Sequence, residues 1–245
     1  MKPLELIGVE GLPEVRSGDD LAQLLSAHAK FQPGDVLVMA QKVVSKAEGR
    51  LIDLAAVVAG EDAVRIAGGL IANPDPRMVQ VVLDESVRVL RSERVLITET
   101  RQGYVSANAG VDHSNVGGHD KLTLLPVDPD ASAKRLRVRL QELTGVEVGV
   151  IISDTFGRPW RLGIVNVALG VAGMPATVDL RGTLDDDGEP LRATVLAIAD
   201  DIAAGAGLVM GKTNRTPAVI VRGLELRGSG SGRDLIRPQA EDLFR

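Results

Sequence analysis

The stretch VGVIISDTFGRPWRLGIVNVALG, residues 148–170, organises the rest of the chain. Its first part, 148–152, is β-branched and almost uninterrupted, which is typical of a strand buried on both faces. We expect this strand to end in the polar residues that follow, 153–158. A carboxylate and a hydroxyl fixed at a strand end, Asp154 and Thr155, suit a hard divalent cation. The same two residue types also commonly cap a turn, so the stretch alone leaves a metal–phosphate site and a structural turn both open.

The composition excludes several classes of function. Hydrophobic residues make up 44% of the 245 residues but aromatics only 2%, so the core must consist mainly of Val, Leu, Ile and Ala. A net charge of −5 argues against a general nucleic-acid binder, and scarce aromatics argue against base stacking. The absence of cysteine excludes disulfides, zinc–thiolate sites and thiol nucleophiles. Without a membrane-length apolar run or a signal-peptide pattern at Met1, we expect a cytoplasmic protein.

Hydrophobic patterning predicts a mixture of short strands and helices. Strands are expected at 4–9, 35–40, 87–90, 95–98, 104–107, 148–152, 166–173, 176–180 and 217–222. Helices are expected after Asp19 or Asp20, over 51–84, after Asp128, and over 192–210. A hairpin turn is expected at 185–188, and a flexible tail over 228–245. These patterns indicate a mixed α/β protein but do not reveal a domain boundary.

Two further segments carry polar side chains suited to ligand binding. Lys42 and Lys46 follow the strand at 35–40, where they could hold an anion or lie on the solvated face of a helix. The loop at 108–118 (NAGVDHSNVGG) is rich in glycine and polar residues, and such loops on rigid scaffolds often carry function. Arg158 and Arg161 could meet phosphate oxygens.

Three other signals are weak. Gly211-Lys212-Thr213 is similar to the end of a P-loop, but the first glycine of that motif would fall on Ala206, and a helix rather than a strand precedes it. The glycines at 228, 230 and 232 do not match a dinucleotide-binding fingerprint. His113 and His119 lie close in sequence but lack the further ligands of a zinc site.

The segments taken together, and in this order, resemble the coenzyme F420-0:γ-glutamyl ligase family, over almost the whole chain. The most specific stretches are NAGVDHSNV at 108–116 and the 148–170 stretch with its SDTFGRPWR. The others are GLPEVRSGDDL at 11–21, GDVLVMAQKVVSKAEGR at 34–50, LLPVDPDASAKRLR at 124–137 and LVMGKTNRTPAVIVRGL at 208–224. The family includes stand-alone ligases and the N-terminal half of a two-domain F420 biosynthesis protein. The tail at 232–245 is similar to the junction in the latter, so both forms stay open.

The resemblance implies an activity and a fold. Its members add L-glutamate to coenzyme F420-0, and then γ-linked glutamates to F420-1, using GTP and Mn²⁺ or Mg²⁺, with K⁺ as a further candidate cation. An acyl phosphate would activate the acceptor carboxylate, because the free carboxylate reacts poorly with an amine. The implied fold is α+β, with mixed, largely antiparallel sheets and two intertwined lobes, in a cytoplasmic homodimer. Residues 1–245 would form one ligase domain.

The resemblance also implies site residues, position by position. Metal ligands would be Asp112, Asp154 and Thr155, and the catalytic residues would be Asp112, Asp154 and Lys46. The nucleotide would contact Leu12, Pro13, Glu14, Val15, Gln41, Lys42, Lys46, Asn115, Met210, Gly211, Lys212 and Thr213. This chain departs from relatives that have an acidic residue directly after the Met-Gly pair: it has Lys212 there, in a loop one residue shorter.

Two other classes of function compete with a ligase. A non-catalytic nucleotide-binding domain would keep the fold but would have no need of Asp112, Asn115, Asp154 and Thr155. A metal-dependent phosphohydrolase would use the same residues and would turn over nucleotide without glutamate. The presence of all four residues favours an enzyme over a scaffold.

Overall fold

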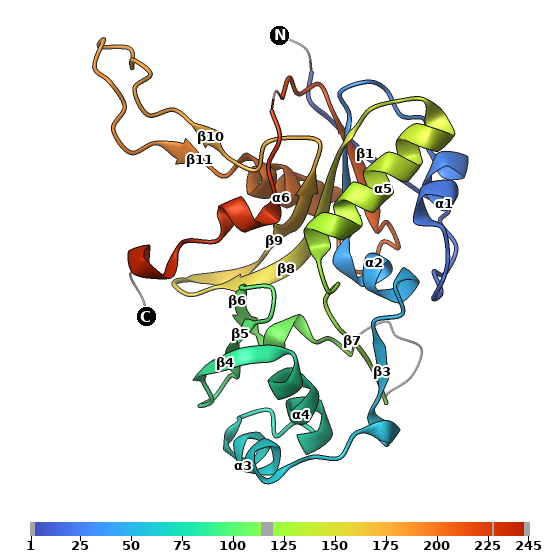
Figure 1. The fold of residues 1–245 in the computed structure, drawn as a ribbon, viewed down its shortest axis with the longest axis vertical. Helices are drawn as coiled ribbons and strands as arrows, with labels where there is room; N and C mark the ends of the chain where they lie inside the picture. The colour runs from blue at the N-terminus through green and yellow to red at the C-terminus, as the bar shows by residue number, and fades with distance from the viewer. Residues whose placement is uncertain (1–2, 114–119, 227, 243–245) are drawn as a thin grey trace.

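The computed structural model describes residues 3–113, 120–226 and 228–242. Its largest element is a five-stranded sheet with the strand order β1-β12-β2-β8-β9 (Figure 1). β2 and β8 run parallel, whereas the other neighbouring pairs are antiparallel. The strands are β1 (Glu5–Gly8), β2 (Val36–Ala40), β8 (Gly149–Arg158), β9 (Arg161–Ala172) and β12 (Ala218–Arg222).

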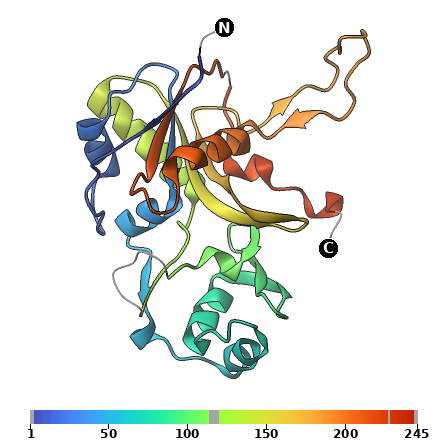
Figure 2. The ribbon, with the colours of Figure 1, turned by 180° about the vertical axis from the view of Figure 1, so that it is seen from behind.

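Helices cover both faces of this sheet (Figures 1 and 2). α1 (Leu21–His28) and α5 (Pro129–Thr144) pack on one face, where they bury Leu37 and Ile152. α6 (Ile198–Met210) packs on the other face over Val38 and Ile151. Successive residues of β2 and β8 are therefore buried on opposite faces, which is why these strands are apolar without alternation.

A second lobe lies below the sheet in Figure 1 and has a core of its own. It contains β3 (Leu51–Asp53), η1 (Leu54–Ala56), α3 (Glu61–Gly69), α4 (Pro76–Asp84), β4 (Ser86–Arg91), β5 (Ile97–Thr100), β6 (Val105–Ala107), η2 (Asn108–Gly110) and β7 (Lys121–Thr123). The chain enters this lobe through β3 and leaves it through β7, and these two strands pair antiparallel. The chain is therefore an α+β protein of two lobes with mixed, largely antiparallel sheets, as expected.

Tyr104 joins the two lobes. Its hydroxyl donates a hydrogen bond to the backbone carbonyl of Leu169 on β9. Tyr104, Leu125 and Leu169 are all buried and form a small apolar cluster at this junction. Burial raises the pKa of the Tyr104 hydroxyl, so this group stays a neutral donor at all ordinary pH values.

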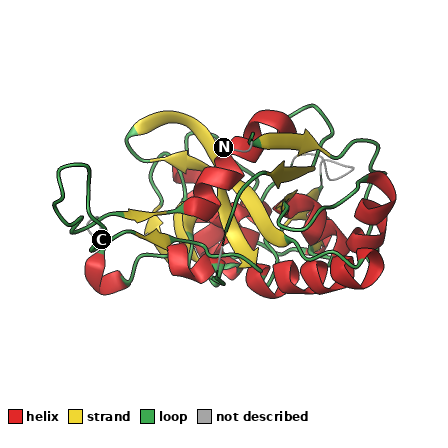
Figure 3. Cartoon of the chain, turned by 90° about the horizontal axis from the view of Figure 1, so that it is seen from above, coloured by secondary structure: helices red, strands yellow, loops and turns green. Residues whose placement is uncertain are grey.

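Two arms extend from the body. β8 and β9 continue past the other strands as a two-stranded ribbon to the pair Arg158–Arg161, with Trp160 at the tip. The second arm, a green loop in Figure 3, lies between β10 (Val178–Asp179) and β11 (Val195–Leu196). Both arms expose large apolar side chains: Leu162 in the ribbon is 98% exposed, and Leu184 in the second arm is 64% exposed.

Three expectations about elements are wrong. The strand starting near Val148 does not end at Ser153, because antiparallel pairing with β9 continues it to Arg158. Residues 51–84 are not one helix: β3 pairs with β7, and α4 starts afresh at Pro76 behind the cap Asp75. The last long helix starts at Ile198 rather than 192, since β11 pairs with β10 just before it.

Part of the expected flexible tail packs against β9. η3 (Gly232–Leu235) begins with the capping residues Ser231 and Asp234, and η4 (Gln239–Glu241) follows it. Asp130 Oδ1 accepts hydrogen bonds from the backbone N–H groups of Val171 and Gly232, at 2.8 and 2.6 Å. A Cβ atom at position 232 would lie 1.9 Å from the carbonyl oxygen of Leu169, so only glycine fits there. Asp130 thus ties the tail to the edge strand.

No helix within the described ranges is both long and apolar enough to cross a lipid bilayer.

Candidate functional site

The site begins where β2 and β8 stop pairing. The last parallel pair is Ala40 and Ser153. After Ala40 the chain turns directly into α2 (Gln41–Ala47), which carries Lys42 and Lys46 one turn apart. After Ser153, β8 continues alone beside β9 and carries Asp154 and Thr155. The end of the β2–β8 pair therefore sets two lysines beside a carboxylate and a hydroxyl.

Asp112 reaches this position from the second lobe. It follows η2 and is held by backbone hydrogen bonds in both directions with Thr123. Its carboxylate Oδ2 accepts a hydrogen bond of 2.7 Å from Lys42 Nζ. The contact joins α2 of the sheet lobe to the polar loop at 108–118, and so brings together two segments that the sequence singles out separately.

Asp154 is half-buried, and its environment is unusual for a carboxylate. The pKa of Asp154 is raised to about 6, mainly by burial and to a smaller extent by nearby Asp112. A hydrogen bond from the Thr155 backbone and the charges of Lys212 and Lys42 act in the opposite direction. The protein therefore stabilises the ionised form of Asp154 only in part, and a bound divalent cation would supply the missing positive charge.

Lys212 completes the cluster from the loop after α6. Its Nζ donates a hydrogen bond of 2.5 Å to Thr155 Oγ1. Gly211, directly before it, ends the helix because its φ of 57° departs from the helical range, and its N–H makes the last helical hydrogen bond, to the Gly207 carbonyl. The family resemblance places this loop over the nucleotide, but no pattern in the sequence indicates that Lys212 contacts Thr155.

The remaining predicted nucleotide contacts lie in several environments. Glu14 forms an ion pair with Lys46, whose side chain is only 12% exposed. Gln41 is buried, and its Oε1 accepts a hydrogen bond of 2.9 Å from Ser45. Pro13 is exposed, as are Gly211 and Thr213 beside Lys212, whereas Leu12, Val15 and Met210 are half-buried or buried. Asn115 lies outside the described residues.

Two arginines expected near phosphate lie elsewhere. Arg158 is four residues beyond Asp154 along β8, roughly 13 Å away at the usual rise of a strand. Its guanidinium donates to the backbone carbonyl of Leu162 at the ribbon tip. Arg161 pairs with Arg158 across this turn. Among the residues that the structure describes, Lys42 and Lys212 are the cations in contact with the predicted metal ligands.

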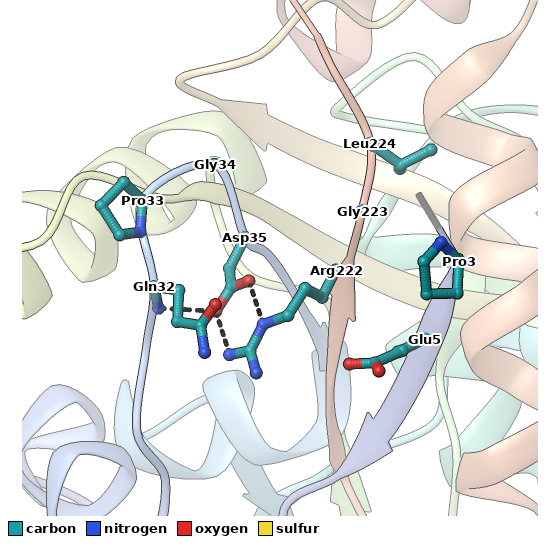
Figure 4. Close-up of a pocket in the computed structure, with 9 residues that line it drawn as sticks. All are labelled: Pro3, Glu5, Gln32, Pro33, Gly34, Asp35, Arg222, Gly223 and Leu224. Atoms are coloured by element: carbon teal, nitrogen blue, oxygen red, sulfur yellow. Dashed lines mark hydrogen bonds and ion pairs between the residues drawn. The ribbon is translucent and has the colours of Figure 1, made fainter. Parts of the chain in front are cut away.

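A hollow of about 310 Å³ lies at the opposite end of β2 (Figure 4). Its main polar feature is the ion pair between Asp35 and Arg222, with two nitrogen–oxygen contacts of 2.8 and 2.7 Å. Asp35, only 1% exposed, also accepts a hydrogen bond from the Gln32 backbone. All acceptors of this carboxylate are engaged within the protein, so we assign the pair to stability and not to ligand binding.

Comparison with known proteins decides the family. The family model described as F420-0:Gamma-glutamyl ligase matches residues 11–223. The chain belongs to this family. It is 41% identical over 249 residues to the coenzyme F420:L-glutamate ligase of Methanocaldococcus jannaschii, covering 100% of the chain and 98% of the relative. It is 46% identical to the protein of the same name from Archaeoglobus fulgidus, covering 99% of the chain and 96% of the relative. The ligase of Methanopyrus kandleri is 45% identical over the full length of both proteins.

Membership in the γ-glutamyl ligase family gives the cluster a context. Asp112, Asp154 and Thr155, implied as metal ligands by the resemblance, lie together with Lys42 and Lys212 in the structure. Within the described residues, no group of three or more His, Asp or Glu side chains is placed to hold a metal ion. Any cation bound here would therefore be held by the two carboxylates, water and substrate oxygens, a donor set that suits Mg²⁺ or Mn²⁺ with a nucleotide.

Proposed function

We propose that this chain is a GTP-dependent ligase that adds L-glutamate to coenzyme F420-0, and then adds γ-linked glutamates to F420-1. The observation that carries the proposal is the meeting of Asp112, Asp154, Lys42 and Lys212 at the end of the β2–β8 pair, in a member of a γ-glutamyl ligase family. The family supports a ligase role in F420 biosynthesis, and the cluster has the charges that phosphoryl transfer requires. The proposal places the reaction in the cytoplasm.

The chemistry has two steps. In the first, an oxygen of the F420-0 carboxylate attacks the γ-phosphorus of GTP, the bond to the β-phosphate oxygen breaks, and an acyl phosphate and GDP form. In the second, the amine of glutamate attacks the acyl carbon, inorganic phosphate leaves, and the nitrogen loses a proton. The protein needs no covalent nucleophile for this sequence, which agrees with the absence of cysteine.

The side chains at the site match the charge that develops in the first step. Phosphoryl transfer is accelerated mainly by fixed positive charge and by positioning. Lys42 on α2 and Lys212 after α6 approach the site from two directions and lie beside Asp112 and Thr155. Lys46, one helical turn beyond Lys42, is held by Glu14 and can exchange this partner for a phosphate.

A divalent cation fits the carboxylates. Asp154 and Asp112 would hold it, and Mg²⁺ or Mn²⁺ would neutralise charge on the phosphates when bound. The raised pKa of Asp154 supports this assignment, because a buried carboxylate that is poorly compensated by the protein favours cation binding. K⁺ is a further candidate for the phosphate-binding region.

We also propose a homodimer. The ribbon tip exposes Trp160 and Leu162, and the second arm exposes Leu184, Val195 and Leu196. Large exposed apolar patches often mark protein–protein contact surfaces, which supports a subunit contact through these arms. Sedimentation velocity of wild-type protein and of Trp160→Ser/Leu162→Ser tests this, since the double variant should sediment as a monomer. A wild-type protein that is monomeric at micromolar concentration would exclude the dimer.

Mass spectrometry of F420-0 incubated with the protein, GTP, Mn²⁺ and glutamate tests the ligase. We expect a mass increase of one or more glutamyl residues that requires every component. Release of phosphate from GTP without glutamate and without product would instead indicate a phosphohydrolase. GTP binding with neither product nor phosphate would indicate a non-catalytic domain. Asp154→Asn is the matched inactive control.

A further inference from the structure

The charged groups of the site alternate in sign. Lys42 Nζ lies 2.7 Å from Asp112 Oδ2, and Lys212 Nζ lies 2.5 Å from Thr155 Oγ1. Lys212 also acts electrostatically on Asp154. Two ammonium groups therefore lie among two carboxylates and one hydroxyl, so the chain itself supplies part of the positive charge that a phosphoryl-transfer site needs.

Few side-chain oxygen atoms at the site remain available to bind metal ions. Thr155 Oγ1 is in contact with an ammonium group, and a divalent cation bound at the same oxygen would lie close to that charge. Like charges about 4 Å apart repel by roughly 4 kcal/mol per unit charge product near a protein surface. Within the described residues Asp154 takes part in no ion pair. The two carboxylates, Asp112 and Asp154, are enough for one hard cation completed by water and phosphate oxygens, but not for two.

The position of Lys212 is built into the fold. Its loop follows the C-terminus of α6, where the helix dipole favours a positive charge. Gly211 turns the chain, and Asn214 ties the loop back to the helix through a hydrogen bond from its Nδ2 to the Val209 carbonyl. This geometry directs the ammonium group of Lys212, which is an exposed residue, to the Thr155 hydroxyl on β8.

We infer that the site binds a single divalent cation at Asp154 and Asp112, and that the Lys212 ammonium at Thr155 supplies the positive charge that a second metal ion would otherwise bring. This inference rests on the proposed function, in which GTP binds at this cluster. In this single-cation arrangement, Thr155 positions Lys212 and does not bind the metal. Lys212 meets the nucleotide phosphates directly and replaces a metal ion as their counter-charge.

Counting bound Mn²⁺ tests the inference without any turnover. The free Mn²⁺ signal in electron paramagnetic resonance is titrated against protein saturated with a non-hydrolysable GTP analogue, in the absence of F420-0 and glutamate. Wild-type protein saturated with the analogue and freed of unbound analogue should bind one Mn²⁺ per protomer, an ion shared by the two carboxylates and the phosphates. Lys212→Glu should bind one more, because it replaces the ammonium with a carboxylate next to Thr155. Lys134→Glu, an equal charge change on the exposed face of α5, is the matched control and should leave the count unchanged.

Two outcomes would overturn the inference. Wild-type protein that binds two Mn²⁺ ions per protomer leaves no role for Lys212 as a substitute cation. A Lys212→Glu variant that gains no ion, while its melting temperature without ligand equals that of wild type, shows that Lys212 does not occupy a cation position.

Thr155→Val provides an independent measurement. Mn²⁺ affinity should change less than about threefold in this variant, whereas Asp154→Asn should weaken it more than tenfold. An equal loss in both variants would make Thr155 a metal ligand and would overturn the inference. Failure of the proposed function would give a different result: the protein would still bind one Mn²⁺ per protomer, but no glutamylated product would form.

Discussion

Ala40 on β2 and Ser153 on β8 are the last parallel pair of the central sheet. Beyond them the two chains separate, one into α2 with its lysines and the other into a ribbon with β9. Asp154 is the first residue of β8 without a β2 partner, and Lys42 lies at the same end of the sheet. Asp112 and Lys212 reach this point of divergence from other parts of the chain, through their contacts with Lys42 and Thr155.

Asp154→Asn should abolish ligation without unfolding the protein. The substitution keeps the shape of the side chain but removes the charge that a divalent cation requires. We expect product formation to fall at least 100-fold, which corresponds to about 3 kcal/mol. Mass spectrometry of the F420-0 reaction measures this, and far-UV circular dichroism checks the fold. A variant with near wild-type activity at ordinary Mn²⁺ would remove Asp154 from the site.

Asp154 should also make the ligand-free protein less stable as pH rises from about 4 to about 6. Burial raises its folded-state pKa to about 6, above the value in an unfolded chain, so the folded protein binds the extra proton in this range. Stability is therefore highest below the unfolded pKa and falls as the pH passes through the folded pKa, by an amount on the order of 2 kcal/mol for this group.

Comparison of wild type with Asp154→Asn isolates that contribution. The difference in their urea-unfolding free energies should change between pH 4 and pH 6.5, with the variant gaining relative stability at the higher pH. A difference that stays constant over this range would show that the carboxylate is not perturbed. Added Mn²⁺ should reverse the trend for the wild type only.

GTP should raise the melting temperature of the protein, because a ligand that binds only the folded state stabilises it by mass action. The increase should require Mg²⁺ or Mn²⁺, since Asp112 and Asp154 would otherwise repel the phosphates. It should exceed the increase given by ATP at the same concentration. Differential scanning fluorimetry measures both, and equal responses to GTP and ATP would contradict the expected base preference.

Lys46→Met should weaken nucleotide use by at least about tenfold, as expected for loss of a charge-assisted phosphate contact. The melting temperature without nucleotide should hardly change, because the partner of Lys46 is the largely exposed Glu14, and exposed ion pairs contribute little. The apparent Michaelis constant for GTP is the measurement, with Lys134→Met as the surface control. An apparent Michaelis constant within twofold of the wild-type value would show that Lys46 only forms a structural ion pair with Glu14.

Arg222→Met should destabilise the protein by roughly 3–5 kcal/mol, because it leaves the buried carboxylate of Asp35 without its counter-ion. Replacing both partners, in Asp35→Leu/Arg222→Met, should recover most of this loss. Urea unfolding of Arg222→Met, Asp35→Leu and the double variant, each against wild type, measures the effect. A loss in the double variant equal to the sum of the two single losses would show that the residues act independently. Ligation should be unaffected wherever the protein folds, since this pair lies at the other end of β2.

Local chemistry in the sequence determined several elements. The apolar runs at 35–40 and 148–152 are strands because residues buried on both faces need no alternation, and Asp20 and Asp128 cap the helices expected after them. The polar segments after these strands, and the loop containing Asp112, were also recognisable as candidate site residues. These features depend on short stretches whose residues act on their immediate neighbours.

Pairing between distant segments decided the rest. Polar residues 153–158 look like a strand end, yet they stay in β8 because β9 satisfies their backbone groups. Residues 51–84 look helical throughout, but β3, where the chain enters the second lobe, pairs with β7, where the chain leaves it. The contacts Lys42–Asp112 and Lys212–Thr155 join residues 70 and 57 positions apart. Such contacts depend on how the lobes and α6 pack, and packing is a property of the whole chain that no local pattern encodes.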